Sequence, residues 1–359
     1  MVIGQFIQGR DNNYNLLRHV AAALVIFTHS YGLTGAGNEE PFKFLTGLSA
    51  SYIAVNVFFI LSGFLITASW LNQPKLSIYI SARVLRIFPA LWVSIGACLF
   101  LVGPLFTALP LKDYFIHRDF YIFTFENSTL ILRGVYHHLP GLFTNLPEAG
   151  IVNESLWTLP YELKMYIIVI IFGLIGAFKS PRIIVLIYLT FLAFYLIDSN
   201  AEVGGSSRLA SYFMAGSVYY LYKDKIRLSW NWFVVLLSTV VTGYLESQSI
   251  GTVILTLVLP YLVFVLAYLP SGSVRNFNHF GDYSYGLYIY AFPIQQILVK
   301  SGIMNIYLHI SMSYILTLIV AISSWHIIEK PALSRRARLA SLLDVECNSF
   351  LAPVKKIFG

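Results

Sequence analysis

Charged residues are scarce in this sequence. Asp, Glu, Lys and Arg make up 11% of its 359 residues, whereas soluble domains carry about 25%. So little charge cannot cover the surface of a soluble domain, and the 57% of hydrophobic residues gather in long apolar runs. This pattern is typical of a polytopic helical membrane protein. The basic residues flank the apolar runs, so we expect them to set membrane topology and not to bind nucleic acid.

Cysteine is also rare, and several ligand-binding motifs are missing. Cys98 and Cys347 are too far apart for a disulfide framework or a metal site, and we expect both to be inert. The chain lacks a Walker phosphate loop, a dinucleotide-binding glycine fingerprint and a zinc-binding pair of histidines on one helix. His137 and His138 stand without further ligands at metal spacing. We therefore predict no metal.

The apolar runs predict an all-α integral membrane protein, a bundle of about ten transmembrane helices. The predicted spans are 16–34, 51–71, 84–106, 160–178, 182–198, 207–222, 230–246, 251–269, 284–301 and 308–328. The first run has no convincing cleavage site, so we expect a retained signal anchor. Most of the 24 lysines and arginines fall on one side of such a bundle. The positive-inside rule then predicts cytoplasmic N- and C-termini.

One long connection, at about 107–159, is predicted on the outer side of the membrane. It is rich in aromatic residues, Pro, Asn and His. Loops of this length are often functional, and the alternative is a partly disordered outer loop.

The first span carries two ionisable residues, Arg18 and His29. They lie about 16 Å apart along a helix and at nearly the same helical phase. Charged residues within a span usually face a cavity or a partner, so the pair predicts a cavity open to the cytoplasm. The alternative is an arginine that snorkels to the interface and a histidine satisfied in the core.

A second basic pair, Arg83 and Arg86, is spaced for one helix face at the inner end of the third span, just before Pro89. Together with Arg18 it places three guanidinium groups near one rim. Such planar, permanently charged groups suit phosphate oxygens. Membrane topology and lipid headgroups explain the same residues without a ligand.

Other polar residues in the spans allow two interpretations. Asn56, Ser62 and Gly63 in the second span favour helix–helix packing. Glu162 is favoured at a helix start by the helix dipole, and it is also able to orient a histidine from another helix. A tyrosine cluster in the ninth span lines a cavity or forms an interfacial aromatic belt; it comprises Tyr283, Tyr285, Tyr288 and Tyr290.

Six features follow one another along nearly the full chain. They are Arg18 and His29 with ten residues between them, "FFILSGFLIT", "RVLRIFP", "SLWTLPYEL", "SYGLYIYAFPI" and "IEKP". Taken in this order, they resemble the membrane acyltransferase-3 family, which O-acetylates bacterial surface and secreted polysaccharides. One departure is Ala291, which stands where many relatives have histidine.

The resemblance implies acetyl transfer from cytoplasmic acetyl-CoA to a hydroxyl of a polysaccharide or lipid-linked glycan, in the bacterial inner membrane. It implies that residues 1–335 form the transmembrane domain and 336–359 a short basic cytoplasmic tail, with no appended soluble esterase-like domain. His29 carries over as the essential histidine, Arg18 as its partner, Arg83 and Arg86 as the basic pair, and Glu162 as the acidic position.

On this interpretation three arginines, Arg18, Arg83 and Arg86, hold the phosphates of acetyl-CoA, and neutral His29 acts as general base. A covalent acetyl-histidine is the alternative. Glu162 orients or compensates the imidazole. The acceptor glycan is expected to contact residues of the outer loop and the ninth span, namely Asn153, Glu154, Trp157 and Tyr288.

Two other functional classes stay open at this stage. A transporter or exporter of a polysaccharide precursor also uses intramembrane Arg and His residues, although paired broken helices in matching halves are not evident. A non-catalytic membrane subunit of an envelope complex is the third class, and it leaves the arginine and histidine motifs without a purpose.

Overall fold

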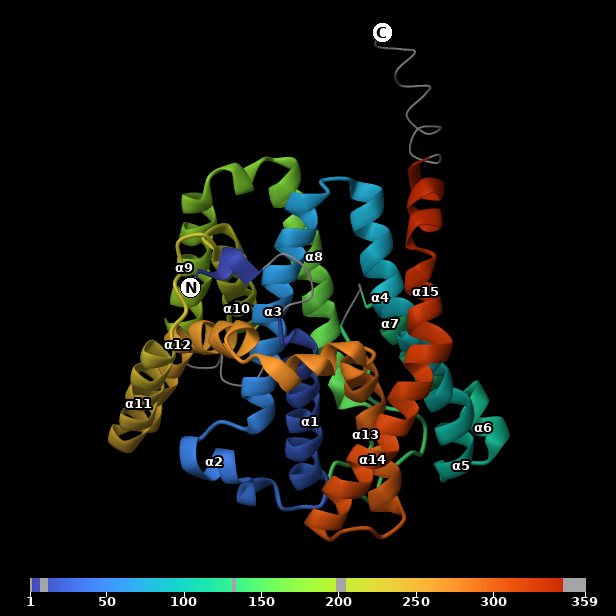
Figure 1. The fold of residues 1–359 in the computed structure, drawn as a ribbon. Helices are drawn as coiled ribbons and strands as arrows, with labels where there is room; N and C mark the ends of the chain where they lie inside the picture. The colour runs from blue at the N-terminus through green and yellow to red at the C-terminus, as the bar shows by residue number, and fades with distance from the viewer. Residues whose placement is uncertain (1, 7–11, 131–133, 198–204, 345–359) are drawn as a thin grey trace, which may run out of the picture.

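The computed structural model describes residues 2–6, 12–130, 134–197 and 205–344, which are mostly helical (Figure 1). The long helices are α1 (Tyr14–Leu33), α3 (Ala50–Asn72), α4 (Leu76–Ala97), α8 (Leu159–Leu174), α9 (Pro181–Ile197), α10 (Ser206–Leu221), α11 (Trp230–Glu246), α12 (Gln248–Tyr268), α13 (Ser284–Lys300) and α14 (Ile306–Ser324). The shorter ones are α2 (Pro41–Thr46), α5 (Gly103–Phe106), α6 (Leu111–Ile116), α7 (Arg118–Thr129) and α15 (Lys330–Ser334). Each predicted span overlaps one of the long helices. The all-α class is therefore confirmed for the described residues.

Within the described ranges, six helical stretches are long and apolar enough to cross a membrane. They are Tyr14–Leu33, Ala50–Asn72, Leu76–Phe106, Glu154–Leu174, Gln248–Tyr268 and Ile306–Asp344. Large apolar side chains are exposed on outward faces, among them Leu186, Val234 and Ile319, as expected of helices that face lipid. These features support a multi-pass membrane protein. Ten crossings and the orientation of the termini stay predictions.

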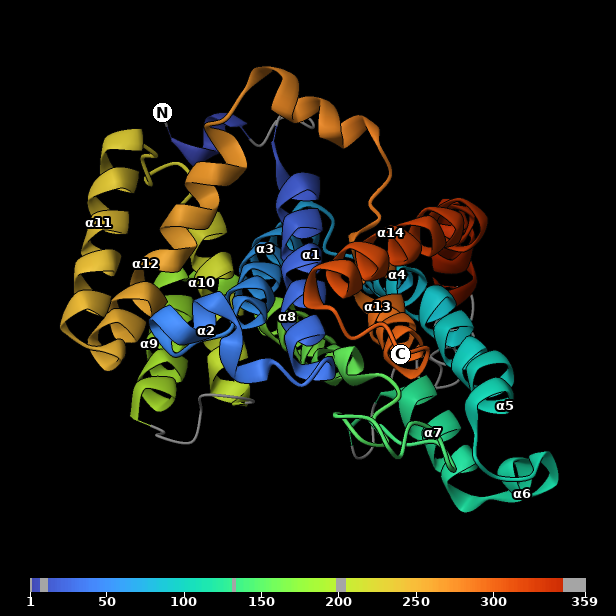
Figure 2. The same cartoon turned by 90° about the horizontal axis from the view of Figure 1, so that it is seen from below.

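Helices α1 and α3 lie at the centre of the bundle when it is seen end on (Figure 2). α3 packs against α10 on one side and α1 on the other, and α1 packs against α13 and α14. A Cβ atom added at Gly63 would lie 1.9 Å from the carbonyl oxygen of Phe213, and one at Gly216 would lie 2.1 Å from that of Ile60. Backbones approach this closely only where side chains are missing. The packing role expected for Gly63 is confirmed.

α4 begins earlier than the third predicted span. It starts at Leu76, not at residue 84, and continues through a π-helical segment, Cys98–Val102, to α5. Polar residues in its first turns, such as Ser77 and Ser81, hid this start from an apolar-run prediction, although both are buried. Arg83 and Arg86 therefore lie two to three turns inside the helix and not at its end.

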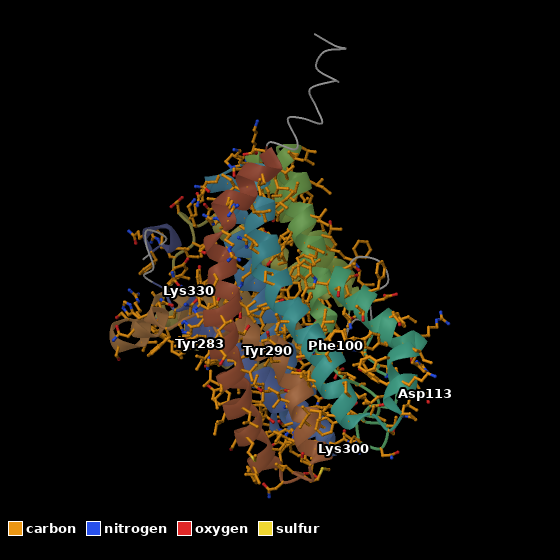
Figure 3. All side chains as sticks on the ribbon, turned by 90° about the vertical axis from the view of Figure 1, so that its right-hand side faces the viewer. Phe100, Asp113, Tyr283, Tyr290, Lys300 and Lys330 are labelled. Atoms are coloured by element: carbon orange, nitrogen blue, oxygen red, sulfur yellow. The ribbon has the colours of Figure 1, made fainter. Side chains whose placement is uncertain are left out.

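The last predicted span is also longer than expected. Helix continues from Ile306 to Asp344. Its first part, α14, packs against α13 and α1, and its later part, from Trp325 through α15, packs against α4 (Figures 1 and 3). Lys75 Nζ lies 2.6 Å from Asp344 Oδ2 and ties the end of this helix to the turn before α4. The predicted tail at 336–359 is thus helical as far as Asp344, and its remainder, with Cys347, lies outside the described residues.

The long connection between α5 and α8 has its own structure. It contains α6, α7 and a 3-10 turn at Glu154–Thr158. The Asn127 side chain exchanges two hydrogen bonds with the backbone of Tyr136, at 2.9 and 3.0 Å. These hydrogen bonds join two parts of the connection to each other. Its last turn contains Trp157, which belongs to the site described next.

Candidate active site

Two cavities adjoin within the bundle. The first, here called the arginine cavity, has a volume of about 520 Å³ and is lined by Arg18, Arg83 and Arg86. The second, the histidine cavity, has a volume of about 580 Å³ and is lined by His29. Val55 of α3 and Tyr288 of α13 line both cavities. The region around these two residues is here called the joint. Volumes of this size accommodate drug-sized ligands.

Arg18 and Arg86 converge on one carboxylate, that of Asp282. Asp282 Oδ2 lies 2.5 Å from Arg18 Nη1 and 2.7 Å from Arg86 Nη2. Arg86 also lies 3.4 Å from Glu329 Oε2. Burial alone would raise the pKa of Asp282, but the positive charges of Arg18 and Arg86 outweigh it and hold this pKa well below its usual value. Two of the three predicted arginines are thus largely neutralised within the protein.

Arg83 is different, because it forms no ion pair with any described residue. Its guanidinium carbon lies 5.9 Å from the ring centroid of Tyr79 and 5.7 Å from that of Tyr166. Its Nε has no hydrogen-bond partner. Arg336, in the helical extension after α15, lines the same cavity and is exposed. No carboxylate among the described residues forms an ion pair with either of these two side chains, so both are available to an anionic ligand.

The structure places Glu162 in the arginine cavity, away from His29. Its carboxylate accepts a hydrogen bond from the hydroxyl of Tyr166, one turn further along α8. Glu162 is absent from the lining of the histidine cavity, and no hydrogen bond joins it to His29 in the described part of the chain. The expected orientation of His29 by Glu162 is therefore not present, and a catalytic role for Glu162 stays a prediction.

His29 lies in the wall of the histidine cavity near the end of α1. Its ring meets that of Phe292 edge to face, with 5.1 Å between centroids. Its Nδ1 is buried and has no hydrogen-bond partner. Three carboxylates, Glu40, Glu148 and Glu154, line the same cavity. Glu148 Oε1 lies 3.3 Å from the point where a Cβ atom of Gly32 would stand, which is beside α1 about one turn beyond His29.

Asn153 supports the site from behind the cavity. Pro293 in α13 has no N–H to donate to the carbonyl of Ile289, four residues earlier. That carbonyl accepts instead from Asn153 Nδ2 at 2.8 Å and from Ser94 Oγ at 3.2 Å. Asn153 is 1% exposed and lines neither cavity. Its geometry is that of a tether between the long connection and α13, and not that of a glycan contact.

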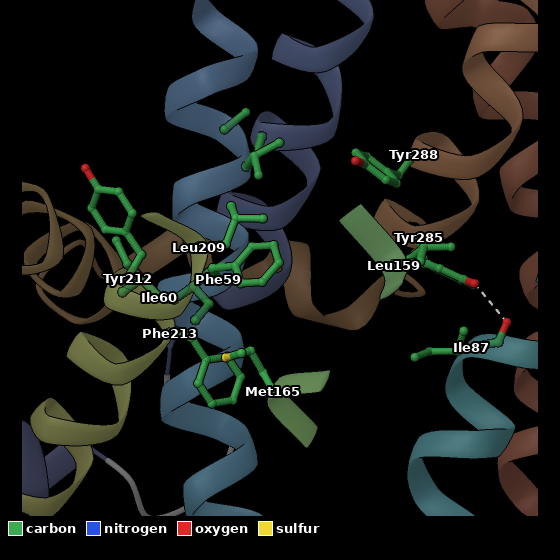
Figure 4. Packing of buried hydrophobic residues seen from close by; sticks show 14 of the residues in the cluster. Phe59, Ile60, Ile87, Leu159, Met165, Leu209, Tyr212, Phe213, Tyr285 and Tyr288 are labelled. Carbon is green, nitrogen blue, oxygen red and sulfur yellow. Dashed lines mark hydrogen bonds between the residues drawn. The ribbon is translucent and has the colours of Figure 1, made fainter. Parts of the chain in front are cut away.

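The tyrosines of α13 face inward, so an interfacial belt does not describe them. The hydroxyl of Tyr285 donates to the carbonyl of Ile87 at 2.8 Å, as the dashed line in Figure 4 marks. Tyr288 shares a hydrogen bond of 2.8 Å with Thr158 at the joint of the two cavities. Trp157 lines the histidine cavity, and its contact with the glycan stays a prediction.

Sequence reasoning missed Asp282 and Glu329. Glu329 lies in the fragment "IEKP", one residue after the last predicted span, and Asp282 comes two residues before "SYGLYIYAFPI" and the ninth predicted span. Their signal was a carboxylate beside each of these two apolar spans. No group of three or more His, Cys, Asp or Glu residues in the described ranges is arranged to hold a metal ion.

Sequence comparison with known proteins shows what the chain is similar to. The model of the acyltransferase-3 family, described as an acyltransferase domain, matches residues 11–326. The chain is 30% identical to an O-acetyl transferase of Shigella phage Sf6 over 93% of this chain and 99% of that protein. It is 24% identical to Nodulation protein 10 of Rhizobium leguminosarum bv. viciae, over 93% and 96% respectively. No solved structure matches the chain significantly. The chain therefore belongs to the acyltransferase-3 family.

Proposed function

We propose that this acyltransferase is an O-acetyltransferase that moves an acetyl group from acetyl-CoA to a hydroxyl of a cell-surface or secreted polysaccharide, such as O-antigen, capsule or exopolysaccharide, or of its precursor. The observation that carries the proposal is that two adjoining cavities share the lining residues Val55 and Tyr288. One is lined by arginines and the other by a histidine and carboxylates. A relative named O-acetyl transferase, similar over nearly its full length, supports the choice of acyl group.

The arginine cavity suits the acyl donor. Coenzyme A has a phosphorylated head and a flexible arm that ends in a thioester. Arg83 and Arg336 retain their charge and would hold phosphate oxygens by charge-assisted hydrogen bonds. Apolar side chains of α3, such as Phe58 and Leu65, line the cavity beside the arm. Arg18 and Arg86, paired with Asp282, shape the site.

The histidine cavity suits a hydroxyl-rich acceptor. Carboxylates such as Glu148 and Glu154 accept hydrogen bonds from sugar hydroxyls, and Trp157 offers an apolar face for a sugar ring. Tyr288, at the joint, lies where the thioester and the acceptor hydroxyl would meet.

The chemistry follows from the place of His29. Neutral imidazole takes the proton from the acceptor hydroxyl while its oxygen attacks the thioester carbon. The carbon–sulfur bond breaks, and the departing thiolate receives the proton back from the imidazolium. A covalent acetyl-histidine would divide this reaction into two steps. A trapped acetyl group on His29 after incubation with acetyl-CoA alone would distinguish this two-step route from direct transfer.

We place the protein in the bacterial inner membrane with both termini and the arginine cavity on the cytoplasmic side. Arg336 lines this cavity, and Lys75 pairs with Asp344 two turns further along the same helix. These basic residues agree with the positive-inside rule. Single cysteines introduced near Lys75 and near Lys43 should be labelled by an impermeant thiol reagent from opposite sides of the membrane.

The decisive experiment uses purified protein, acetyl-CoA labelled in its acetyl group and an oligosaccharide from the candidate glycan. Wild type should yield labelled, base-labile O-acetyl esters. His29→Ala should lower the rate by at least about 100-fold, because general base catalysis contributes that much, and should still bind acetyl-CoA. A transporter or a non-catalytic subunit yields no acetylated product, and that result would reject the proposal.

A further inference from the structure

A buried arginine in the wall of the histidine cavity has no counterion among the described residues. Arg208, in the first turn of α10, is 2% exposed and lines this cavity together with His29 and Tyr288. A charge near the end of an apolar span usually serves topology and reaches water or headgroups. The Arg208 side chain is buried and does not reach water, so membrane topology does not explain its position.

The guanidinium group is held firmly in place. Its Nη1 donates to Asn56 Oδ1 at 2.6 Å, and its central carbon lies 4.4 Å from the ring centroid of Tyr52. The Tyr52 hydroxyl is fixed in turn by a hydrogen bond with that of Tyr195. The Nε of Arg208 has no partner. None of these contacts neutralises the charge.

The position of this charge relates it to the acyl transfer. Tyr52, Val55 and Asn56 are spaced for one face of α3, and Val55 lines both cavities. Arg208, which contacts Tyr52 and Asn56, therefore lies near the joint. A buried charge without a counterion costs several kcal/mol. A negatively charged oxygen at the joint would offset that cost.

The lining of the cavity indicates when such an oxygen is present. Three carboxylates, Glu40, Glu148 and Glu154, line it. They oppose an acceptor with a permanent negative charge and favour a neutral one with many hydroxyls. With a neutral acceptor, the negative charge near Arg208 arises during the reaction itself.

We propose that Arg208 is a catalytic residue that stabilises the oxyanion formed on the acyl carbonyl oxygen, an inference that rests on the proposed function. The acceptor oxygen bonds to the carbonyl carbon while its proton passes to His29. The carbonyl π electrons move to the oxygen, which Arg208 stabilises. On collapse the carbon–sulfur bond breaks, and the thiolate takes the proton from His29. A fixed charge that needs no reorganisation is suited to this task.

Arg208→Gln tests the assignment through thiol release from acetyl-CoA, measured with a neutral oligosaccharide and with water as the only acceptor. Both reactions pass through an oxyanion, so kcat should fall about 100- to 1000-fold in both. Binding of acetyl-CoA should not change, because Arg208 is absent from the arginine cavity. Arg208→Lys keeps the charge without the fork, and we expect an intermediate loss. The control is Arg182→Gln, at an exposed arginine of α9, which should behave as wild type.

Three results would overturn the assignment. Unchanged kcat in Arg208→Gln would remove Arg208 from catalysis. A raised KM for the oligosaccharide with unchanged hydrolysis would make Arg208 an acceptor-binding residue. Loss of acetyl-CoA binding in both Arg208 variants would make Arg208 a structural residue of the α3–α10 contact and not a catalytic one. Wild-type protein that releases no thiol in either assay would instead reject the proposed function, so the two failures are distinguishable.

Discussion

Arg18 and Asp282 form an ion pair of 2.5 Å between α1 and the residue that comes two positions before α13. The same carboxylate oxygen also contacts Arg86 of α4. Asp282 therefore joins three helices at the arginine cavity. It also divides the predicted phosphate-binding arginines into a paired set, Arg18 and Arg86, and an unpaired residue, Arg83.

Replacement of Asp282 by Asn should destabilise the protein. Arg18 and Arg86 would face each other without the carboxylate between them, and breaking a buried ion pair costs about 3 kcal/mol. Thermal unfolding in detergent measures the loss. The matched control is Asp113→Asn, at an exposed carboxylate without an ion pair in the described residues. Equal stabilities of the two variants would contradict a structural role for this pair.

The pH dependence of that difference follows from the lowered pKa of Asp282. A carboxylate with a lowered folded-state pKa contributes stability that is present above its unfolded pKa of about 3.9 and is lost as the pH falls through the folded-state pKa. The stability difference between wild type and Asp282→Asn should therefore be present near neutral pH and shrink below about pH 4. A difference that disappears near neutral pH would contradict this account.

Arg83→Gln should act on acyl-donor binding without affecting stability. Charge-assisted hydrogen bonds contribute about 1.5–3 kcal/mol, so the KM for acetyl-CoA should rise about 10- to 100-fold while that for the glycan stays unchanged. Arg18→Gln, by contrast, leaves Asp282 with one partner fewer and should lower the unfolding temperature. Steady-state kinetics and thermal unfolding on both variants separate these roles. Equal rises in both KM values for Arg83→Gln would indicate general damage.

The helices could be predicted from the sequence because apolar runs determine where helices span a membrane. The phase of Arg18 and His29 also indicated that both face the interior, although the structure assigns them to adjoining cavities. The partners could not be predicted, since Asp282 lies 264 residues from Arg18 and 196 from Arg86. Such contacts depend on how helices pack, which residue spacing along one helix does not reveal.

Glu154→Gln and Glu162→Gln should affect different substrates, because each carboxylate lines only one cavity. Glu154→Gln should raise the KM for the glycan about tenfold, the effect of losing about 1.4 kcal/mol in binding. Glu162→Gln should change the KM for acetyl-CoA instead. Each variant serves as the control for the other. If Glu162→Gln alone altered the pH–rate profile assigned to His29, Glu162 would act on His29, and the division of roles between the two cavities would be wrong.

Gly63→Ala should destabilise the contact between α3 and α10. Its Cβ atom would stand 1.9 Å from the carbonyl oxygen of Phe213, so the helices must separate, and overpacking of this kind costs about 1–3 kcal/mol. Gly96→Ala in α4 is the matched control, since no atom lies within 4 Å of its added Cβ. That variant should be neutral or slightly more stable, because Ala favours helix over Gly. Thermal unfolding of both variants gives the comparison, and an unaffected Gly63→Ala would mean that the α3–α10 contact is looser than described.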